Sequence, residues 1–207
     1  MKHRILAGVL AFCMLVPVNV FSAEEEKRAE FKQAEYTLAQ NVMDKLGILE
    51  YSEDNLTDVI SRVDFAVYLA RLLKINEYEM QDYTYYTDIV KNHYGLKSVN
   101  YLTEIGGFDG YGNSEFRPDE PISPIAAVKV IFNVLGYKNY AEAFGGYPNA
   151  YIEMASKTDL LEGFEGCKDL TREELSVLLF RAGYLYLPGG KCLPRRYIFA
   201  PCAFFRL

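Results

Sequence analysis

The feature that most constrains this chain is a pattern that occurs three times along it. Each copy has an apolar stretch with helical spacing, a polar loop, and then Ile or Leu followed by Ser or Thr at the start of a second apolar stretch. One helical hairpin cannot bury its apolar stripe alone, whereas stacked copies bury a continuous core. The sequence contains no alternating apolar pattern of strand length. It therefore predicts an all-α fold of three helix-loop-helix repeats.

The starts of the second helices are the clearest local signal in each copy. Front helices are expected at about residues 34–46, 95–105 and 150–158. The second helices follow Ser61, Ser123 and Thr171, whose side-chain oxygens accept hydrogen bonds from the amides of a first helical turn. Glu174 completes a capping box with Thr171, and Asp64 is a shorter version of it in the first copy. In the second copy a proline takes the first helical position, where its missing N–H costs nothing.

The N-terminal sequence indicates the compartment. A basic start at Lys2 to Arg4 is followed by an apolar run to Val20 and the small residues Ser22 and Ala23, which is the order of a secretory signal peptide. A retained membrane anchor is the alternative, but the run is interrupted and short for a spanning helix. We therefore expect residues 1–23 to be removed during secretion and no membrane span to remain.

Cysteine content, charge and missing motifs argue against several classes of protein. Cys13 leaves with the signal peptide, and an odd number remains, Cys167, Cys192 and Cys202, which argues against a full disulfide framework. A bridge from Cys192 to Cys202 stays open, and the spacings match no zinc site. The formal net charge of −6 argues against a nucleic-acid partner. Because no nucleophile elbow, phosphate-binding loop or HExxH motif is present, we expect neither an enzyme nor a cofactor.

Several segments carry a family resemblance. The chain resembles the S-layer homology (SLH) family over about residues 34–182. The Tyr-Thr-Asp-Ile opening, with the His-Tyr that follows it, is similar to the family's Phe-x-Asp-Val…His-Trp-Ala. The Gly-Tyr-Gly-Asn loop is close to the family's Gly-Tyr-x-Asp-Gly-x-Phe-x-Pro loop. Two helix starts resemble its Ile-Thr-Arg-Ala-Glu signature. These segments are residues 86–94, 110–122, 60–64 and 170–174.

The resemblance implies both a fold and a ligand. The fold is a pseudo-threefold helical prism, and its grooves bind secondary cell-wall polysaccharide linked to peptidoglycan, often through pyruvylated sugars. A pyruvate ketal carries a carboxylate, which Arg binds by paired, charge-assisted hydrogen bonds, and a helix N-terminus adds free amides. The resemblance therefore implies sugar contacts for Arg62 and Arg172, with Asp88, Tyr94 and Tyr111 as further candidates. Non-covalent anchoring at the cell surface is the expected function.

Other interpretations of these residues remain. Arg62 and Arg172 are read otherwise as solvated first-turn residues, and Asp88 as the cap of the second front helix. Ser61, Asp64, Ser123, Thr171 and Glu174 are assigned to helix capping. Most of the 17 tyrosines suit the boundary layer of a small domain, and His93 is interpreted as structural.

The second copy departs from the family pattern, because Ser123-Pro124 lacks the signature Arg. The alternative function is therefore an assembly module that binds another surface protein and has weakened or lost sugar binding. The predicted division is a signal peptide at 1–23, repeats at 24–85, 86–143 and 144–182, and an unassigned segment at 183–207.

Overall fold

The computed structural model describes residues 18–75, 83–164, 168–187 and 191–192. The chain divides into two compact units, Met1–Leu38 and Ala39–Leu207. Among the described residues, no helix combines the length and apolar character needed to cross a membrane. The predicted signal peptide lies mainly outside the described residues, as do Cys167 and Cys202.

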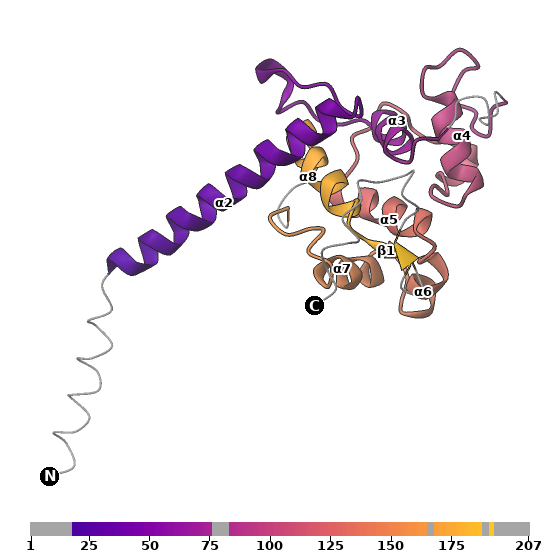
Figure 1. The fold of residues 1–207 in the computed structure, drawn as a ribbon. Helices are drawn as coiled ribbons and strands as arrows, with labels where there is room; N and C mark the ends of the chain where they lie inside the picture. The colour runs from indigo at the N-terminus through magenta and orange to yellow at the C-terminus, as the bar shows by residue number, and fades with distance from the viewer. Residues whose placement is uncertain (1–17, 76–82, 165–167, 188–190, 193–207) are drawn as a thin grey trace, which may run out of the picture. The chain divides into compact units, whose positions relative to one another are not determined.

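The described residues are mostly helical, which confirms the predicted fold class (Figure 1). The α-helices are α2 (Val18–Lys45), α3 (Arg62–Leu72), α4 (Leu96–Glu104), α5 (Pro124–Val134), α6 (Lys138–Ala143), α7 (Asn149–Ser156) and α8 (Arg172–Ala182). Two short 3-10 turns, Glu53–Asn55 and Gly112–Ser114, lie in the loops. The one difference in class is a two-residue antiparallel ribbon of β1 (Tyr186–Leu187) and β2 (Lys191–Cys192). Strands this short leave no period in the sequence.

The first front helix differs most from its expected bounds. Helix α2 begins at Val18 rather than near residue 34. The sequence from Val18 to Lys45 contains neither Gly nor Pro and is rich in Glu, Lys and Ala, so helix propensity is high throughout. The front helices α4 and α7 lie within two residues of the expected bounds. The short helix α6 was not predicted.

Each second helix begins at a capped residue. The Ser61 hydroxyl accepts a hydrogen bond from the Asp64 N–H at 3.1 Å, and Ser123 accepts from the first turn of α5 in the same way at 3.4 Å. In α8, Thr171 accepts from the Glu174 N–H at 3.3 Å, while the Glu174 carboxylate accepts from the Thr171 N–H at 2.9 Å. These bonds satisfy amides that the first helical turn leaves without partners.

A cyclic set of backbone hydrogen bonds joins the three helix starts. The N–H of Ile60 donates to the carbonyl of Leu170 at 2.8 Å, that of Ile122 to Ile60 at 3.0 Å, and that of Leu170 to Ile122 at 2.9 Å. All three side chains are buried. Each start therefore donates to one neighbour and accepts from the other, which is a threefold connectivity. The complete prism stays a prediction.

The core between α3 and α4 depends on one glycine and an aromatic cluster. A Cβ atom added at Gly95, just before α4, would lie 2.1 Å from Val63 Cγ2 of α3, so any other residue here would force Val63 to shift. Phe65 of α3 packs edge-on against Phe108 with 6.3 Å between ring centroids, and Phe108 packs against Phe116 at 5.0 Å. Burial of each such ring stabilises the fold by about 1.5–3 kcal/mol.

Candidate functional site

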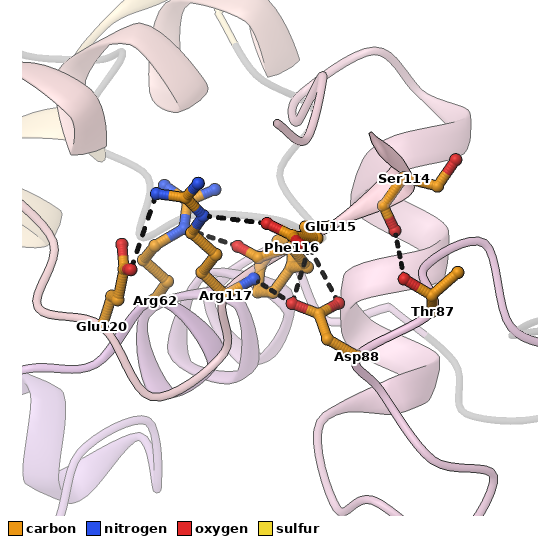
Figure 2. Close-up of polar contacts among 8 residues, drawn as sticks. All are labelled: Arg62, Thr87, Asp88, Ser114, Glu115, Phe116, Arg117 and Glu120. Atoms are coloured by element: carbon orange, nitrogen blue, oxygen red, sulfur yellow. Dashed lines mark hydrogen bonds and ion pairs between the residues drawn. The ribbon is translucent and has the colours of Figure 1, made fainter. Parts of the chain in front are cut away.

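The start of α3 places a buried arginine against an aromatic loop. Arg62 is only 7 % exposed, and its Nε donates to the carbonyl of Phe116 at 3.0 Å (Figure 2). The guanidinium lies over three rings, 5.5 Å from the centroid of Phe108, 4.7 Å from Tyr111 and 4.9 Å from Phe116. Cation–π attraction and the charged hydrogen bond hold the group in one orientation.

A second guanidinium shares the ring of Tyr111. The guanidinium of Arg117 lies 4.3 Å from the Tyr111 centroid. Its Nε is 3.3 Å from a Glu115 carboxylate oxygen and its Nη1 is 3.6 Å from that of Glu120, so two half-exposed ion pairs position it. Arg117 has a φ of +60°, a conformation that costs a non-glycine residue energy and therefore needs support from its surroundings.

Asp88 supplies that support. Its carboxylate accepts from the Phe116 N–H at 2.9 and 3.0 Å and from the Arg117 N–H at 2.6 Å. The neighbouring Thr87 adds a bond from its hydroxyl to the Ser114 carbonyl at 3.2 Å (Figure 2). The interpretation of Asp88 as the cap of α4 is wrong, because that helix begins after Gly95 without a side-chain cap. Asp88 instead fixes the loop that carries the aromatic rings and Arg117.

The surroundings of Arg62 lower the pKa of its guanidinium. Burial lowers the pKa of its guanidinium, Tyr111 and Glu120 raise it, and the like charge of Arg117 lowers it. Among the described residues, the two terminal nitrogens of Arg62 have no hydrogen-bond partner. Two cations on one ring, one of them incompletely hydrogen-bonded, form a site that an anion would complete.

The amides at the helix starts are already used, which corrects one expectation. The N–H groups of Arg62 and Val63 donate to the carbonyls of Glu120 at 2.9 Å and Pro118 at 3.1 Å. At α8 the N–H of Arg172 donates to a loop carbonyl at 2.9 Å in the same way. The third amide of each helix binds its cap. An anion at these sites would therefore rely on guanidinium groups and the helix dipole rather than on free amides.

The side chains of Ser61, Asp64 and Tyr94 meet beside the same helix start. Tyr94 is 66 % exposed and donates from its hydroxyl to Asp64 Oδ1 at 2.7 Å, while the Ser61 hydroxyl donates to Asp64 Oδ2 at 2.7 Å. The Tyr94 ring stacks on His93, with 4.7 Å between centroids and 24° between planes. Partial desolvation of the hydroxyl and its hydrogen bond to Asp64 raise the pKa of Tyr94, so this hydroxyl stays protonated. Tyr94 thus presents a fixed, exposed aromatic face.

Arg172 occupies a different environment at the start of α8. Its Nη1 donates to the Tyr68 hydroxyl of α3 at 3.0 Å, and its guanidinium lies 5.8 Å from the centroid of that ring. The Nε is buried and has no hydrogen-bond partner among the described residues. Arg172 is thus half-buried and tethered, not a solvated first-turn side chain.

The structure brings some predicted residues together and separates others. Arg62, Asp88 and Tyr111 surround one loop, with Tyr94 bonded to the same helix start. Arg172 lies at the second start, and Ser123 caps the third, where no arginine is present. Sequence reasoning did not single out Arg117, Phe116 or Glu120. The Phe-Arg-Pro-Asp-Glu sequence was the available signal, but it was interpreted as part of the family's glycine loop and was given no binding role.

Comparison with known proteins addresses the central segment. Residues 85–123 match the family model of the S-layer homology domain. The chain carries an S-layer homology domain. The matched residues include the predicted site residues Asp88, Tyr94 and Tyr111 and also Arg117.

Two relatives are large surface proteins. The chain is 27 % identical over 141 residues to "Cell surface glycoprotein 1" of Acetivibrio thermocellus, a match that covers 67 % of this chain and 6 % of the relative. It is 22 % identical over 149 residues to "Cell surface protein" of Thermoanaerobacter kivui, covering 70 % of this chain and 18 % of the relative. The chain thus spans less than a fifth of either relative. The SLH match and both names confirm the predicted localisation as a secreted, S-layer-type protein of the cell surface.

Proposed function

We propose that this chain anchors itself to the cell surface by binding an anionic, pyruvylated secondary cell-wall polysaccharide at the start of α3. The observation that carries the proposal is the pair of guanidinium groups, those of Arg62 and Arg117, which lie 4.7 and 4.3 Å from the centroid of one tyrosine ring. The presence of an SLH domain and the surface location of the chain support an anchoring role in general.

The ligand chemistry follows from the charges at this site. A carboxylate accepts two charge-assisted hydrogen bonds from guanidinium groups, and it offsets the repulsion between two adjacent cations. The exposed face of Tyr94 suits the apolar face of a sugar ring, and its bonded hydroxyl keeps that ring in place. The site therefore favours a sugar that carries a carboxylate over a neutral glycan.

The three helix starts differ in what they offer this ligand. The Arg62 site has a second cation, that of Arg117. At the α8 start, one terminal nitrogen of Arg172 already donates a hydrogen bond to the Tyr68 hydroxyl. The α5 start has no arginine. We propose that repeats at 24–85, 86–143 and 144–182 present these starts around the cyclic set of hydrogen bonds, and that the first start binds most strongly.

Co-sedimentation of the full chain with purified cell-wall sacculi tests the proposal. Sacculi would be used intact and after acid removal of the secondary polysaccharide. Binding is expected only to the intact preparation. Arg117→Ala should weaken it about tenfold, the effect of losing one charged hydrogen-bonding group, and Arg172→Ala should weaken it less.

The matched control is Lys157→Ala, which removes one exposed cation at the C-cap of α7 and should leave binding unchanged. Equal binding of the wild-type chain to stripped sacculi would refute the polysaccharide as ligand. An Arg117→Ala chain that binds as well as Lys157→Ala would refute the site.

A further inference from the structure

The start of α5 borders a groove whose chemistry differs from that of the two arginine sites. The groove has a volume of about 470 Å³ and an apolar lining. Its lining residues come from the start of α5, from α7 and from the loop after α7, and they include Ser123, Pro124, Ile152, Ser156, Asp159 and Phe164. Pro124 stands at the first helical position, which Arg62 and Arg172 occupy in α3 and α8.

The walls of this groove are held in place by contacts outside it. Nη1 of Arg181, on α8, donates to the carbonyl of Asp159 at 3.0 Å and to that of Glu162 at 2.8 Å. Its guanidinium lies 5.5 Å from the centroid of Phe164, which is buried. Ile152 of α7, which also lines the groove, is 48 % exposed. The groove is therefore preformed and leaves an apolar side chain uncovered by the described residues.

The polar groups of the groove exclude an anionic sugar. Among the described residues that line it, none is Lys or Arg. The Ser123 hydroxyl accepts from an α5 amide and the Ser156 hydroxyl donates to a backbone carbonyl, so both are engaged. Asp159 is exposed, and its carboxylate forms no ion pair within the described part of the chain. An apolar occupant with a positive charge near Asp159 would complement this lining.

We propose that residues 193–207 of this chain bind in the groove. These residues lie outside the described part of the structure, but their sequence has the required chemistry. Arg195-Arg196 directly precede Tyr197-Ile198-Phe199, a third arginine follows at Arg206, and the segment contains no acidic residue. A volume of about 470 Å³ lies within the range of pockets that enclose a small ligand, so it admits a few side chains rather than the whole segment. The proposed occupant is the Tyr197–Phe199 triplet, with an adjacent arginine near Asp159.

The proposal is independent of polysaccharide binding, because the groove and the Arg62 site involve different helix starts. It gives the α5 start a role as a protein-docking surface. The occupant is the same segment whether it comes from the same chain or from a second copy.

Photo-crosslinking of the full chain tests which segment lies in the groove. A benzoylphenylalanine replacing Ile152 would be illuminated and the products mapped by mass spectrometry, with Val90, which is 68 % exposed and outside the groove, as the matched position. Crosslinks from position 152 to residues 195–206 are expected, and none from position 90. Mixed light and isotope-labelled chains then assign the segment to one chain or two. Crosslinks from position 152 only to other segments, or to no part of the protein, would overturn the proposal.

Limited trypsin digestion provides a second measurement that does not depend on crosslinking. Ile152→Glu should raise the rate of cleavage after Arg195 and Arg196 at least severalfold, and the charge-neutral Asp159→Asn should raise it less. Val90→Glu is the control, and far-UV circular dichroism verifies that each variant is folded. Equal cleavage rates in the wild-type, Ile152→Glu and Val90→Glu chains would contradict docking of the segment.

Discussion

Replacement of Arg62 by Met separates the structural role of this side chain from its proposed binding role. Met keeps most of the apolar volume between Phe108 and Phe116 and makes favourable contacts with aromatic rings. It removes the charged donor from the Phe116 carbonyl, an interaction worth about 1.5–3 kcal/mol, together with cation–π attraction of roughly 1 kcal/mol. Because the Met contacts recover part of this loss, Arg62→Met should lower the free energy of unfolding by about 2–3 kcal/mol.

Urea unfolding followed by circular dichroism measures this change, with Arg117→Met as the comparison. Arg117 is half-exposed and its ion pairs lie at the surface, so its replacement should cost about 0.5 kcal/mol or less. Both variants should bind intact sacculi more weakly than the wild-type chain, although only one is strongly destabilised. A loss below about 0.5 kcal/mol for Arg62→Met, or an equal loss for both variants, would refute the argument that burial and the Phe116 bond make Arg62 structural.

Three further predictions concern local features of the fold. Gly95→Ala should destabilise the chain by about 1–3 kcal/mol, because its Cβ would lie 2.1 Å from Val63 Cγ2. In a double-mutant cycle, Val63→Ala in the same chain should recover part of this loss. Additive losses of stability in the cycle would contradict the contact between these two residues. Thr171→Ala should lower the free energy of unfolding by about 1 kcal/mol, because the α8 cap is lost. Thr171→Ser should lower it little, and urea unfolding measures both changes. Equal losses of stability in the two variants would exclude the cap as the cause. Burial raises the pKa of Tyr51 from 10.0 to about 12, so the folded state holds a proton that the unfolded state releases first. The free energy of unfolding should therefore fall by roughly 2 kcal/mol as pH rises from about 10 to about 12. Tyr51→Phe should make the free energy of unfolding less dependent on pH in this range. An unchanged pH dependence in the variant would show that other groups cause it.

The helix starts could be predicted because their determinants lie within a few residues of one another. A Ser or Thr followed three residues later by Asp or Glu satisfies the first amides of a helix without help from distant parts of the chain. The repeated apolar spacing then predicted the helical class. The presence of the SLH domain was also evident in the sequence, because its loop and opening residues are contiguous in residues 85–123.

The environments of these helix starts could not be predicted, because they depend on residues far apart in the sequence. Arg62 is buried only because the loop at Phe116, 54 positions later, covers it and accepts its hydrogen bond. The sequence suggested that the first-turn amides of α3 could bind an anion. In the structure these amides donate hydrogen bonds to the carbonyls of Pro118 and Glu120. Arg117 gains a role through a shared tyrosine ring rather than through any motif position.

What the sequence by itself determined is where helices begin and which domain it carries, since caps and domain motifs are local patterns. Only the tertiary structure decided the character of the three starts. It places two cations on Tyr111 at one, tethers Arg172 to Tyr68 at another, and forms an apolar groove beside Pro124 at the third. The physical reason is that burial, charge pairing and groove shape arise from contacts between distant segments, here joined through the hydrogen bonds of Ile60, Ile122 and Leu170.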